Sequence, residues 1–280
     1  MFVSLSKYSA FKSYGFFSMY SIIKNIFKQP NLWAAALPLQ LLGIYSVFQL
    51  FSNEFSVTTL IYIICGTICI ELLGVSIGLH RWASHQSFEV HPLWKPIILF
   101  FSCLACQGSA IFWATIHRSY HHRYSDTDKD PHSFKDGFLH SYILWMFKIE
   151  EGKYNGKRIL DLLNDKTVVF FHKYYILIIW LTNLIAFFVD QNFWLFFIIF
   201  PSFITFHKFC LQTSIVHNIK LGYRNYHTKE DSVNIPWLFP ITFGEAWHNN
   251  HHSNPKSPKI IKVNWWEIDP TYFLVKLICK

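Results

Sequence analysis

The chain has 280 residues, of which 52% are hydrophobic, 19% aromatic and only 15% charged. Because soluble domains carry about 25% charged residues and disordered chains are poor in apolar residues, this composition excludes both classes and favours a membrane protein. The formal charge of +8 is better explained by basic loops facing anionic lipid than by nucleic-acid binding. The six cysteines are scattered and indicate no disulfide framework.

Four long apolar runs predict membrane-spanning helices arranged as two hairpins. They cover residues 32–51, 56–79, 174–189 and 193–207. Each run approaches the length that crosses a bilayer, and Glu71 is the one charge within them. A further apolar run at 96–113 is either a fifth span or a helix lying in the interface. We therefore expect an all-α integral membrane protein that forms a single domain over residues 1–280.

The distribution of Lys and Arg predicts the orientation of these spans. The turns at 52–55 and 190–192 carry neither residue, whereas the amino terminus and residues 80–173 and 208–280 carry nearly all of them. Under the positive-inside rule, both termini and these two segments are cytoplasmic, in a bacterial inner membrane or the endoplasmic reticulum. A fifth span at 96–113 would place basic segments on the outer side of the membrane. An even number of spans keeps both termini and the basic segments on the cytoplasmic side, so four spans are favoured.

Three dense histidine clusters lie in the segments predicted to be cytoplasmic. They are His80-x4-His85 after the second span, His117-x3-His121-His122 after the middle apolar run, and His248-x2-His251-His252 in the tail. Residues three or four apart share one face of an α-helix, so His117 with His121, and the three histidines of the tail, can present imidazoles to a transition metal. His80 and His85 are five apart and need a helix end or a kink to converge.

The number of histidines favours two metals. Eight clustered imidazoles exceed the four ligands of a typical zinc site. The chain has no H-E-x-x-H motif of the metalloproteases and no pair of Glu-x-x-His motifs of the soluble di-iron bundles. A lone histidine near a membrane interface is usually a solvated polar residue, but three clusters on one predicted side are not explained in that way.

These motifs resemble those of the membrane fatty-acid desaturases, in particular the acyl-CoA Δ9 (stearoyl-CoA type) branch and its bacterial-like members. The three clusters match the three histidine boxes of that family. Three further stretches are also similar: Ser125-Asp-Thr-Asp-Lys-Asp-Pro-His132, Gly244-Glu-Ala-Trp-His248 and Trp265-Trp-Glu-Ile-Asp-Pro-Thr-Tyr272. The similarity runs from about residue 40 to the carboxyl terminus and implies four spans capped by a cytoplasmic helical domain that carries a di-metal site.

The resemblance implies a ninth histidine ligand, His217, at the cytoplasmic end of the last span. The implied ligand set is therefore His80, His85, His117, His121, His122, His217, His248, His251 and His252. Two positions depart from the family pattern. Thr213 stands where family members carry an Asn that holds one metal through water, so that contact is in doubt. Tyr120 is an apparent insertion in the second box, and either the helix bulges there or the ligand set shifts; we predict the bulge.

Acidic residues beside the boxes are candidates for orienting the ligand rings. Asp126, Asp128, Asp130 and Glu245 are placed to accept the second N–H of a ligand imidazole. Alternatively, they form an acidic patch that pairs with nearby arginines and lysines. His132, in the Asp-Pro-His stretch, is a further candidate for such support.

The remaining titratable residues have weaker interpretations. His91, His140, His172, His207 and His227 are expected to be interfacial or structural. Glu71 within a span is costly unless it faces protein or water, and it either lines the substrate route or supports a helix contact.

The resemblance implies an oxygen-dependent desaturase that introduces a cis double bond, at Δ9, into a saturated acyl chain. Removing hydrogen from an unactivated methylene needs a metal and dioxygen rather than amino-acid side chains, and the family uses two iron ions. The chain has no Rossmann glycine fingerprint and no haem domain, so electrons from NAD(P)H would arrive through a separate ferredoxin or b-type cytochrome with its reductase. The acyl chain, linked to CoA, a carrier protein or a phospholipid, would enter a narrow, bent apolar tunnel.

Two alternatives stay open at this point. A hydroxylase, ketolase or acetylenase could use the same di-iron centre. A non-enzymatic metal transporter would need ionisable residues deep inside several spans, where the sequence places only Glu71.

Overall fold

A computed structural model describes residues 32–52, 55–149 and 156–280. Within these residues the chain is helical, and its β-type pairings are limited to isolated bridges such as Tyr223 with Asn234. This confirms the predicted all-α class. The basic amino terminus, and positions 53–54 of the first predicted turn, lie outside the described residues.

Three helices are long and apolar enough to cross a membrane, or up to four if one bent pair counts as a single span. The three are Trp33–Ser52, Val57–Ser84 and Gln191–Ile215, and the bent pair is Lys166–Lys173 with Tyr175–Val189, which meet at 67°. Three of the four predicted spans are thus single long helices, and the fourth, predicted at 174–189, is one arm of the bent pair. The last helix continues eight residues beyond the predicted end at 207, because two further helical turns bury Lys208 and Gln212 against protein.

Each span is built from consecutive helical segments. The first comprises η2 (Leu32–Ala36) and α2 (Leu37–Ser52), and the second comprises α3 (Val57–Thr67) and the π-helix η3 (Ile68–Ser84). The bent pair is α9 (Lys166–Lys173) and α10 (Tyr175–Val189). The last span comprises α11 (Gln191–Phe193), the π-helix η8 (Trp194–Ile199) and α12 (Phe200–Ile215).

Large apolar side chains cover the outer faces of the spanning helices. Phe48 and Phe51 on α2 are 63% and 83% exposed, and Phe188 and Val189 on α10 are 76% and 78% exposed. Water would make such a surface unfavourable, whereas lipid tails would not. The outer faces of these helices are therefore those of a membrane protein.

The apolar run at 96–113 does not form a long helix. It forms α4 (Trp94–Leu104), a loop, and α5 (Ala110–Ala114), and neither helix is long enough to cross a bilayer. Helix α4 packs closely on η3, where the Ser102 hydroxyl donates to the Gly74 carbonyl at 2.8 Å. A Cβ on Gly74 would lie 2.7 Å from the Phe101 carbonyl carbon, so only glycine permits this approach.

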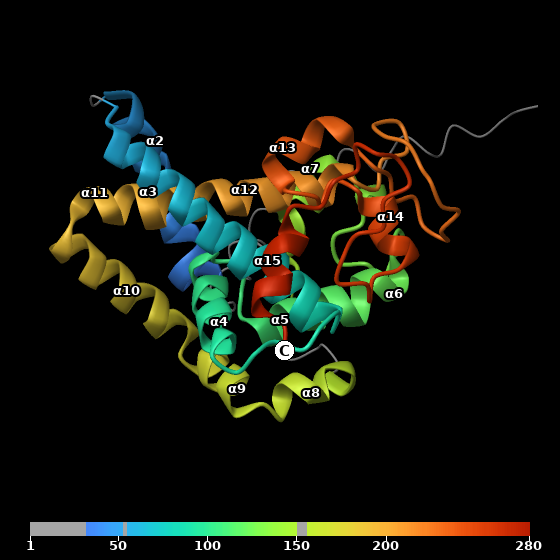
Figure 1. Cartoon of the computed structure of the whole chain (residues 1–280), viewed down its shortest axis with the longest axis horizontal. Coiled ribbons are helices and arrows are strands. Elements are labelled where there is room, and N and C mark those ends of the chain that lie inside the picture. Colours follow the sequence, from blue (N-terminus) through green and yellow to red (C-terminus); the bar gives the residue numbers. More distant parts are fainter. Residues whose placement is uncertain (1–31, 53–54, 150–155) are drawn as a thin grey trace, which may run out of the picture.

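The segments that carry the histidines gather at one end of the molecule. In Figure 1, α2, α10 and α11 lie on the left, whereas α6 (His122–Tyr124) and α14 (His248–Ser253) lie on the right. A buried apolar cluster joins η3, α4 and α5 through Leu79, Leu99 and Trp113. This packing fixes the ends of the helices that carry the first two boxes relative to each other.

The remaining helices are short. They are the π-helix η4 (Thr115–His121), η5 (Phe134–Asp136), α7 (Phe138–Tyr142), η6 (Leu144–Phe147), η7 (Gly156–Ile159), α8 (Leu160–Leu163), η9 (Pro236–Leu238), α13 (Phe239–Thr242) and α15 (Thr271–Ile278).

Candidate metal centre

The first histidine box lies at the end of the π-helix η3. A π-helix forms its hydrogen bonds between residues five apart, and the His85 amide accordingly donates to the His80 carbonyl at 3.1 Å. The two rings therefore lie on the same face, with centroids 4.7 Å apart. The sequence predicted that His80 and His85 converge only at a helix end or a kink. Here the π-helix brings them together.

The second box lies on another π-helix, η4, which ends at His121. This confirms the predicted bulge at Tyr120. The rings of His117 and His122, five residues apart, have centroids 4.6 Å apart. The predicted pairing of His117 with His121 is found in one possible group, with His132, whereas the π spacing also places His117 with His122 in a larger group and His121 with other histidines.

The third box lies on the short helix α14. His248 and His252 are one α-helical turn apart, and their Nε2 atoms lie 3.0 Å apart. His251 lies between them in sequence and points to a different set of rings, with its Nε2 3.1 Å from those of both His80 and His85. One turn of helix therefore contributes to both halves of the cluster.

All nine histidines predicted from the sequence come together in two groups. In each group, the atoms available for a metal lie within 4.8 Å of one another. The first group contains His80, His85, His117, His122 and His251; the second contains His121, His217, His248 and His252. His217 follows the end of α12 and completes the second group, with its Nε2 3.2 Å from that of His248. Seven of the nine side chains are buried, and His122 and His252 are partly buried.

The rings are closely spaced, and the pKa shifts differ between them: at His217, burial would lower the pKa, but Asp126 and Glu230 outweigh it and raise the pKa. Burial, together with the neighbouring imidazoles, lowers the pKa of His117, His122 and His251 well below the ordinary value. Two ligand nitrogens about 2.1 Å from one metal and at a right angle to each other are about 3 Å apart. The Nε2–Nε2 distances of 3.0–3.3 Å within the groups fit this spacing.

Three of the predicted acidic residues contact Nδ1 of histidines in the two groups. The contacts are His80 Nδ1 to Glu245 Oε2 at 2.8 Å, His121 Nδ1 to Asp130 Oδ2 at 2.9 Å, and His217 Nδ1 to Asp126 Oδ2 at 2.9 Å. A carboxylate on Nδ1 fixes the tautomer that leaves Nε2 free to bind a metal. Asp128, by contrast, is exposed.

The alternative of an acidic patch paired with Arg118, Arg123 and Lys129 does not describe these carboxylates, whose close side-chain partners among the described residues are histidines and, for Glu245, Arg81. Arg118 contacts Asp161 at 2.6 Å instead. Burial would raise the pKa of the Asp130 carboxyl, but His121 and His132 outweigh this effect and lower it. Asp130 is therefore ionised beside the histidines.

A buried arginine that the sequence did not single out supports Glu245. Arg81 is 2% exposed, and its guanidinium donates to Glu245 Oε1 at 2.9 Å and to both carboxylate oxygens of Asp269 at 2.8 and 2.9 Å. Burial would raise the pKa of Glu245, but His80 and Arg81 lower it to about 2. The sequence signals were the position of Arg81 inside the first box and of Asp269 inside the stretch 265–272.

A fourth carboxylate near the rings, Glu230, was also missed. Its Oε1 lies 3.4 Å from His252 Nδ1, and its Oε2 lies 3.9 Å from His217 Nδ1. Glu230 sits in a loop without a recognisable motif, so no sequence pattern indicated it.

Thr213 and His132 lie at the edge of the cluster. The Thr213 hydroxyl is 3.0 Å from the Cys210 carbonyl and 3.2 Å from that of Ser141, so it donates to backbone. The ring of His132 packs on that of His121, with centroids 4.3 Å apart. Three of the other histidines have structural hydrogen bonds: His140 to the Pro131 carbonyl, His172 to Ser109 and His207 to Tyr142.

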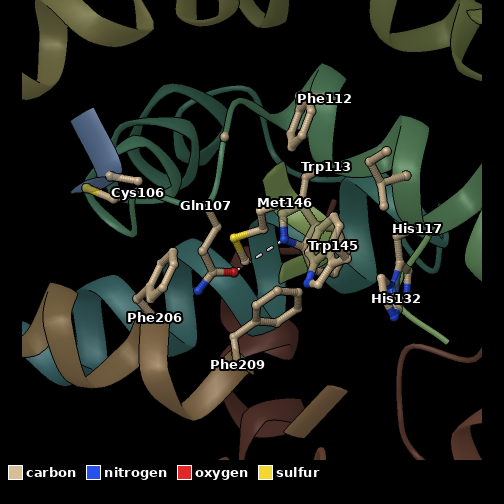
Figure 2. A pocket seen from close by; sticks show the side chains of 13 residues that line it. Cys106, Gln107, Phe112, Trp113, His117, His132, Trp145, Met146, Phe206 and Phe209 are labelled. Atoms are coloured by element: carbon tan, nitrogen blue, oxygen red, sulfur yellow. Dashed lines mark hydrogen bonds between the residues drawn. The ribbon is translucent and has the colours of Figure 1, made fainter. Parts of the chain in front are cut away.

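An apolar cavity of about 630 Å³ leads away from the cluster. Figure 2 shows that it extends from His117 and His132 at one end to Cys106 and Phe206 at the other. The indole of Trp113 donates to Gln107 Oε1 at 3.3 Å in its wall. We call this the first cavity.

A second cavity of about 460 Å³ has part of its lining in common with the first. It shares Trp113, His117, His132 and Phe209 with the first cavity. Its other walls come from η3, from α12 and from the rings of the second group; they include Val75, Ser76, Lys208, Gln212, Thr213, Val216, His121, His217 and His248. The four shared residues therefore border both cavities beside the histidine cluster.

Comparison with known proteins gives a consistent result. A family model described as fatty acid desaturase matches residues 55–279. An sn-1 stearoyl-lipid 9-desaturase of Anabaena variabilis is 34% identical over 85% of this chain and 86% of its own length. A protein of the same name from Synechocystis is 36% identical over 78% and 67% of the two chains. Delta-9 acyl-lipid desaturase 2 of Arabidopsis thaliana is 31% identical over 87% and 78%.

Proposed function

Because this chain belongs to the fatty acid desaturase family, we propose that it introduces a cis Δ9 double bond into a saturated, lipid-linked acyl chain, using two iron ions and dioxygen. The observation that carries the proposal is the convergence of nine histidine rings in two groups, in each of which the candidate ligand atoms lie within 4.8 Å of one another. The names of the relatives support the Δ9 position and the lipid-linked substrate.

The residues fit two iron ions in number and in chemistry. Imidazole suits iron, the pKa values of His117 and His251 are lowered well below the ordinary value, and carboxylates lie on Nδ1 of His80, His121 and His217. In this proposal the first group holds one iron and the second group holds the other. When bound, the irons would supply, with dioxygen, the oxidising power to remove hydrogen from two adjacent methylenes.

The chain itself orients the ligands and excludes water. Arg81 and Asp269 hold the Glu245 carboxylate against His80, and Asp126 and Asp130 hold the rings of the second group. The walls of the first cavity are mainly apolar, with Phe112, Trp113 and Phe209 among them. An acyl chain lying there would pass His117, which borders both cavities.

The electron source and the orientation are part of the proposal. Electrons would come from NAD(P)H through a ferredoxin or a b-type cytochrome with its reductase. The distribution of Lys and Arg supports cytoplasmic termini and a cytoplasmic metal centre. The membrane is then a bacterial inner membrane or the endoplasmic reticulum.

The proposal is tested by expressing the chain in a host that lacks its own desaturase. Mass spectrometry of total lipids should show new cis-Δ9 monounsaturated acyl chains in membrane lipids. The His251→Ala variant should yield none, while a His207→Ala variant, altered outside both groups, should retain them. Hydroxylated, acetylenic or keto products would favour the related di-iron reactions, and an unchanged lipid profile with well-folded protein would contradict the proposal.

A further inference from the structure

A buried ion pair lies beside the second cavity and is not used by the proposed metal centre. Lys208 on α12 and Glu71 on η3 are 7% and 2% exposed, and Lys208 Nζ lies 2.5 Å from Glu71 Oε1. Ser76 donates to the same oxygen at 3.1 Å, and Gln212 Oε1 lies 3.5 Å from Lys208 Nζ. Ionisable residues inside spanning helices are costly and usually functional.

The pair has a defined orientation relative to the cavity. Lys208 lines the cavity, whereas Glu71, to which its ammonium is bound, does not. The Lys208 side chain therefore extends from the cavity wall to the Glu71 carboxylate outside it, and Ser76 and Gln212, which approach the same pair, line the wall beside Lys208. Lysine stems commonly pack as apolar surface while the charged head is satisfied elsewhere.

The position of this wall relates it to the acyl chain. Trp113, His117, His132 and Phe209 border both the first and the second cavity, so a movement of their side chains would join the two. Lys208 and Gln212 lie on the next turns of α12 beyond the cluster, and Val75 and Val216 supply apolar walls between. A chain that passes the histidines from the first cavity would thus run toward the Lys208 stem.

We propose that Lys208, anchored by Glu71, is the end wall of the acyl-chain site and sets the longest methyl-terminal segment that fits beyond the metal centre. The inference rests on the proposed desaturase function. The wall is firm because displacing the lysine would leave the buried Glu71 carboxylate without its partner, which is strongly unfavourable. Lys208 is in this sense a specificity-determining residue rather than a catalytic one.

Two matched double variants test the proposal. The first, Lys208→Ala with Glu71→Gln, removes the ion pair and shortens the wall side chain. The second, Lys208→Met with Glu71→Gln, also removes the ion pair but keeps an unbranched apolar side chain of nearly the length of the lysine stem. Any general effect of losing the pair is common to both, so a difference between them reports on the space at position 208.

The first measurement is the chain-length profile of unsaturated products in the desaturase-deficient host. We expect the Ala variant to gain products of the next even-numbered chain length, and the Met variant to keep the wild-type limit. The second measurement is the thermal shift that saturated fatty acids of increasing length give with the purified, zinc-loaded full chain. The longest stabilising acid should increase only in the Ala variant.

The outcomes separate this inference from the proposed function. Identical length limits in the Ala and Met variants, or an equal shift in both, would overturn the role of Lys208 even though double bonds are formed. Absence of double bonds in the wild-type chain would instead overturn the proposed function, and the thermal-shift series would still report on the wall.

Discussion

The two histidine groups differ in what lies behind their rings. The first group has five imidazoles that pack mainly on one another, and its one close carboxylate, Glu245, is itself bound by Arg81. The second group has four imidazoles, and carboxylates lie against three of them, at His121, His217 and His252. The second group therefore has fewer ring nitrogens and more negative charge around it.

The difference suggests a division of roles. Metal sites that react keep a position open to small ligands, whereas structural sites are closed by protein ligands. The second group has one imidazole fewer, and most of its rings line the second cavity. We expect its metal to exchange ligands more readily, and we expect the first group to hold its metal more tightly.

The largest expected effect is the loss of a ligand from either group. His117→Ala and His217→Ala should each roughly halve the iron content of the purified protein, because they act on opposite groups, and each should abolish desaturation. Iron analysis combined with Mössbauer spectroscopy would measure which site is lost. His207→Ala, also near the end of the last span, is the control and should retain full iron. Equal iron in all three variants would show that the histidines are not ligands.

Smaller losses are expected from the carboxylates. Glu245→Gln should weaken metal binding in the first group, and Asp126→Asn in the second, each by about 10–100-fold, the usual range for residues that orient a ligand. Chelator titration followed by iron analysis would measure both. The exposed neighbour Asp128→Asn should behave as wild type. If Asp126→Asn has no greater effect than Asp128→Asn, the contact with His217 does not support the ligand.

The contrast between the groups was only partly predictable from the sequence. The apolar runs and eight of the histidines follow from composition and spacing, and the resemblance to the desaturases supplied the ninth, His217. The division of the histidines did not follow, because α-helical spacing pairs His117 with His121, whereas a π-helix pairs residues five apart. The insertion of Tyr120 relative to the family pattern predicted the π-type bulge, but it did not indicate which histidines would share a group.

Contacts between side chains far apart in the sequence also could not be predicted from sequence patterns. Glu230 approaches His252 from a loop without a motif, and Asp269 reaches Arg81 across 188 positions. Lys208 looked like the first residue after a span because a charge ends a hydropathy run. Its burial against Glu71 depends on the packing of two helices, which a single run cannot reveal.

The Tyr120 deletion tests the π-helix of the second box. The deletion should convert η4 toward an α-helix and leave His117 and the first histidine of the following pair three residues apart. The bulge already absorbs the extra residue, so we expect the variant to retain iron and part of the activity. Iron content and product formation in the stably folded protein would be measured. Complete loss of iron would mean that the π spacing is required by both groups.

The smallest expected effect is at Thr213, which lines the second cavity beside His121, His217 and His248. Thr213 donates its hydroxyl to backbone, so the second group gains little from it. An asparagine there would bring a longer amide, able to hold a water molecule or the metal, toward the open side of that group. Thr213→Asn should therefore slow the chelator-driven loss of the more labile iron by a few-fold, within the free energy of about one hydrogen bond.

Thr213→Val, which keeps the shape but offers no polar atom, is the control and should leave that rate unchanged. If both variants release iron at the wild-type rate, the open side of the second group does not face position 213, and the second cavity would border the metal from another direction.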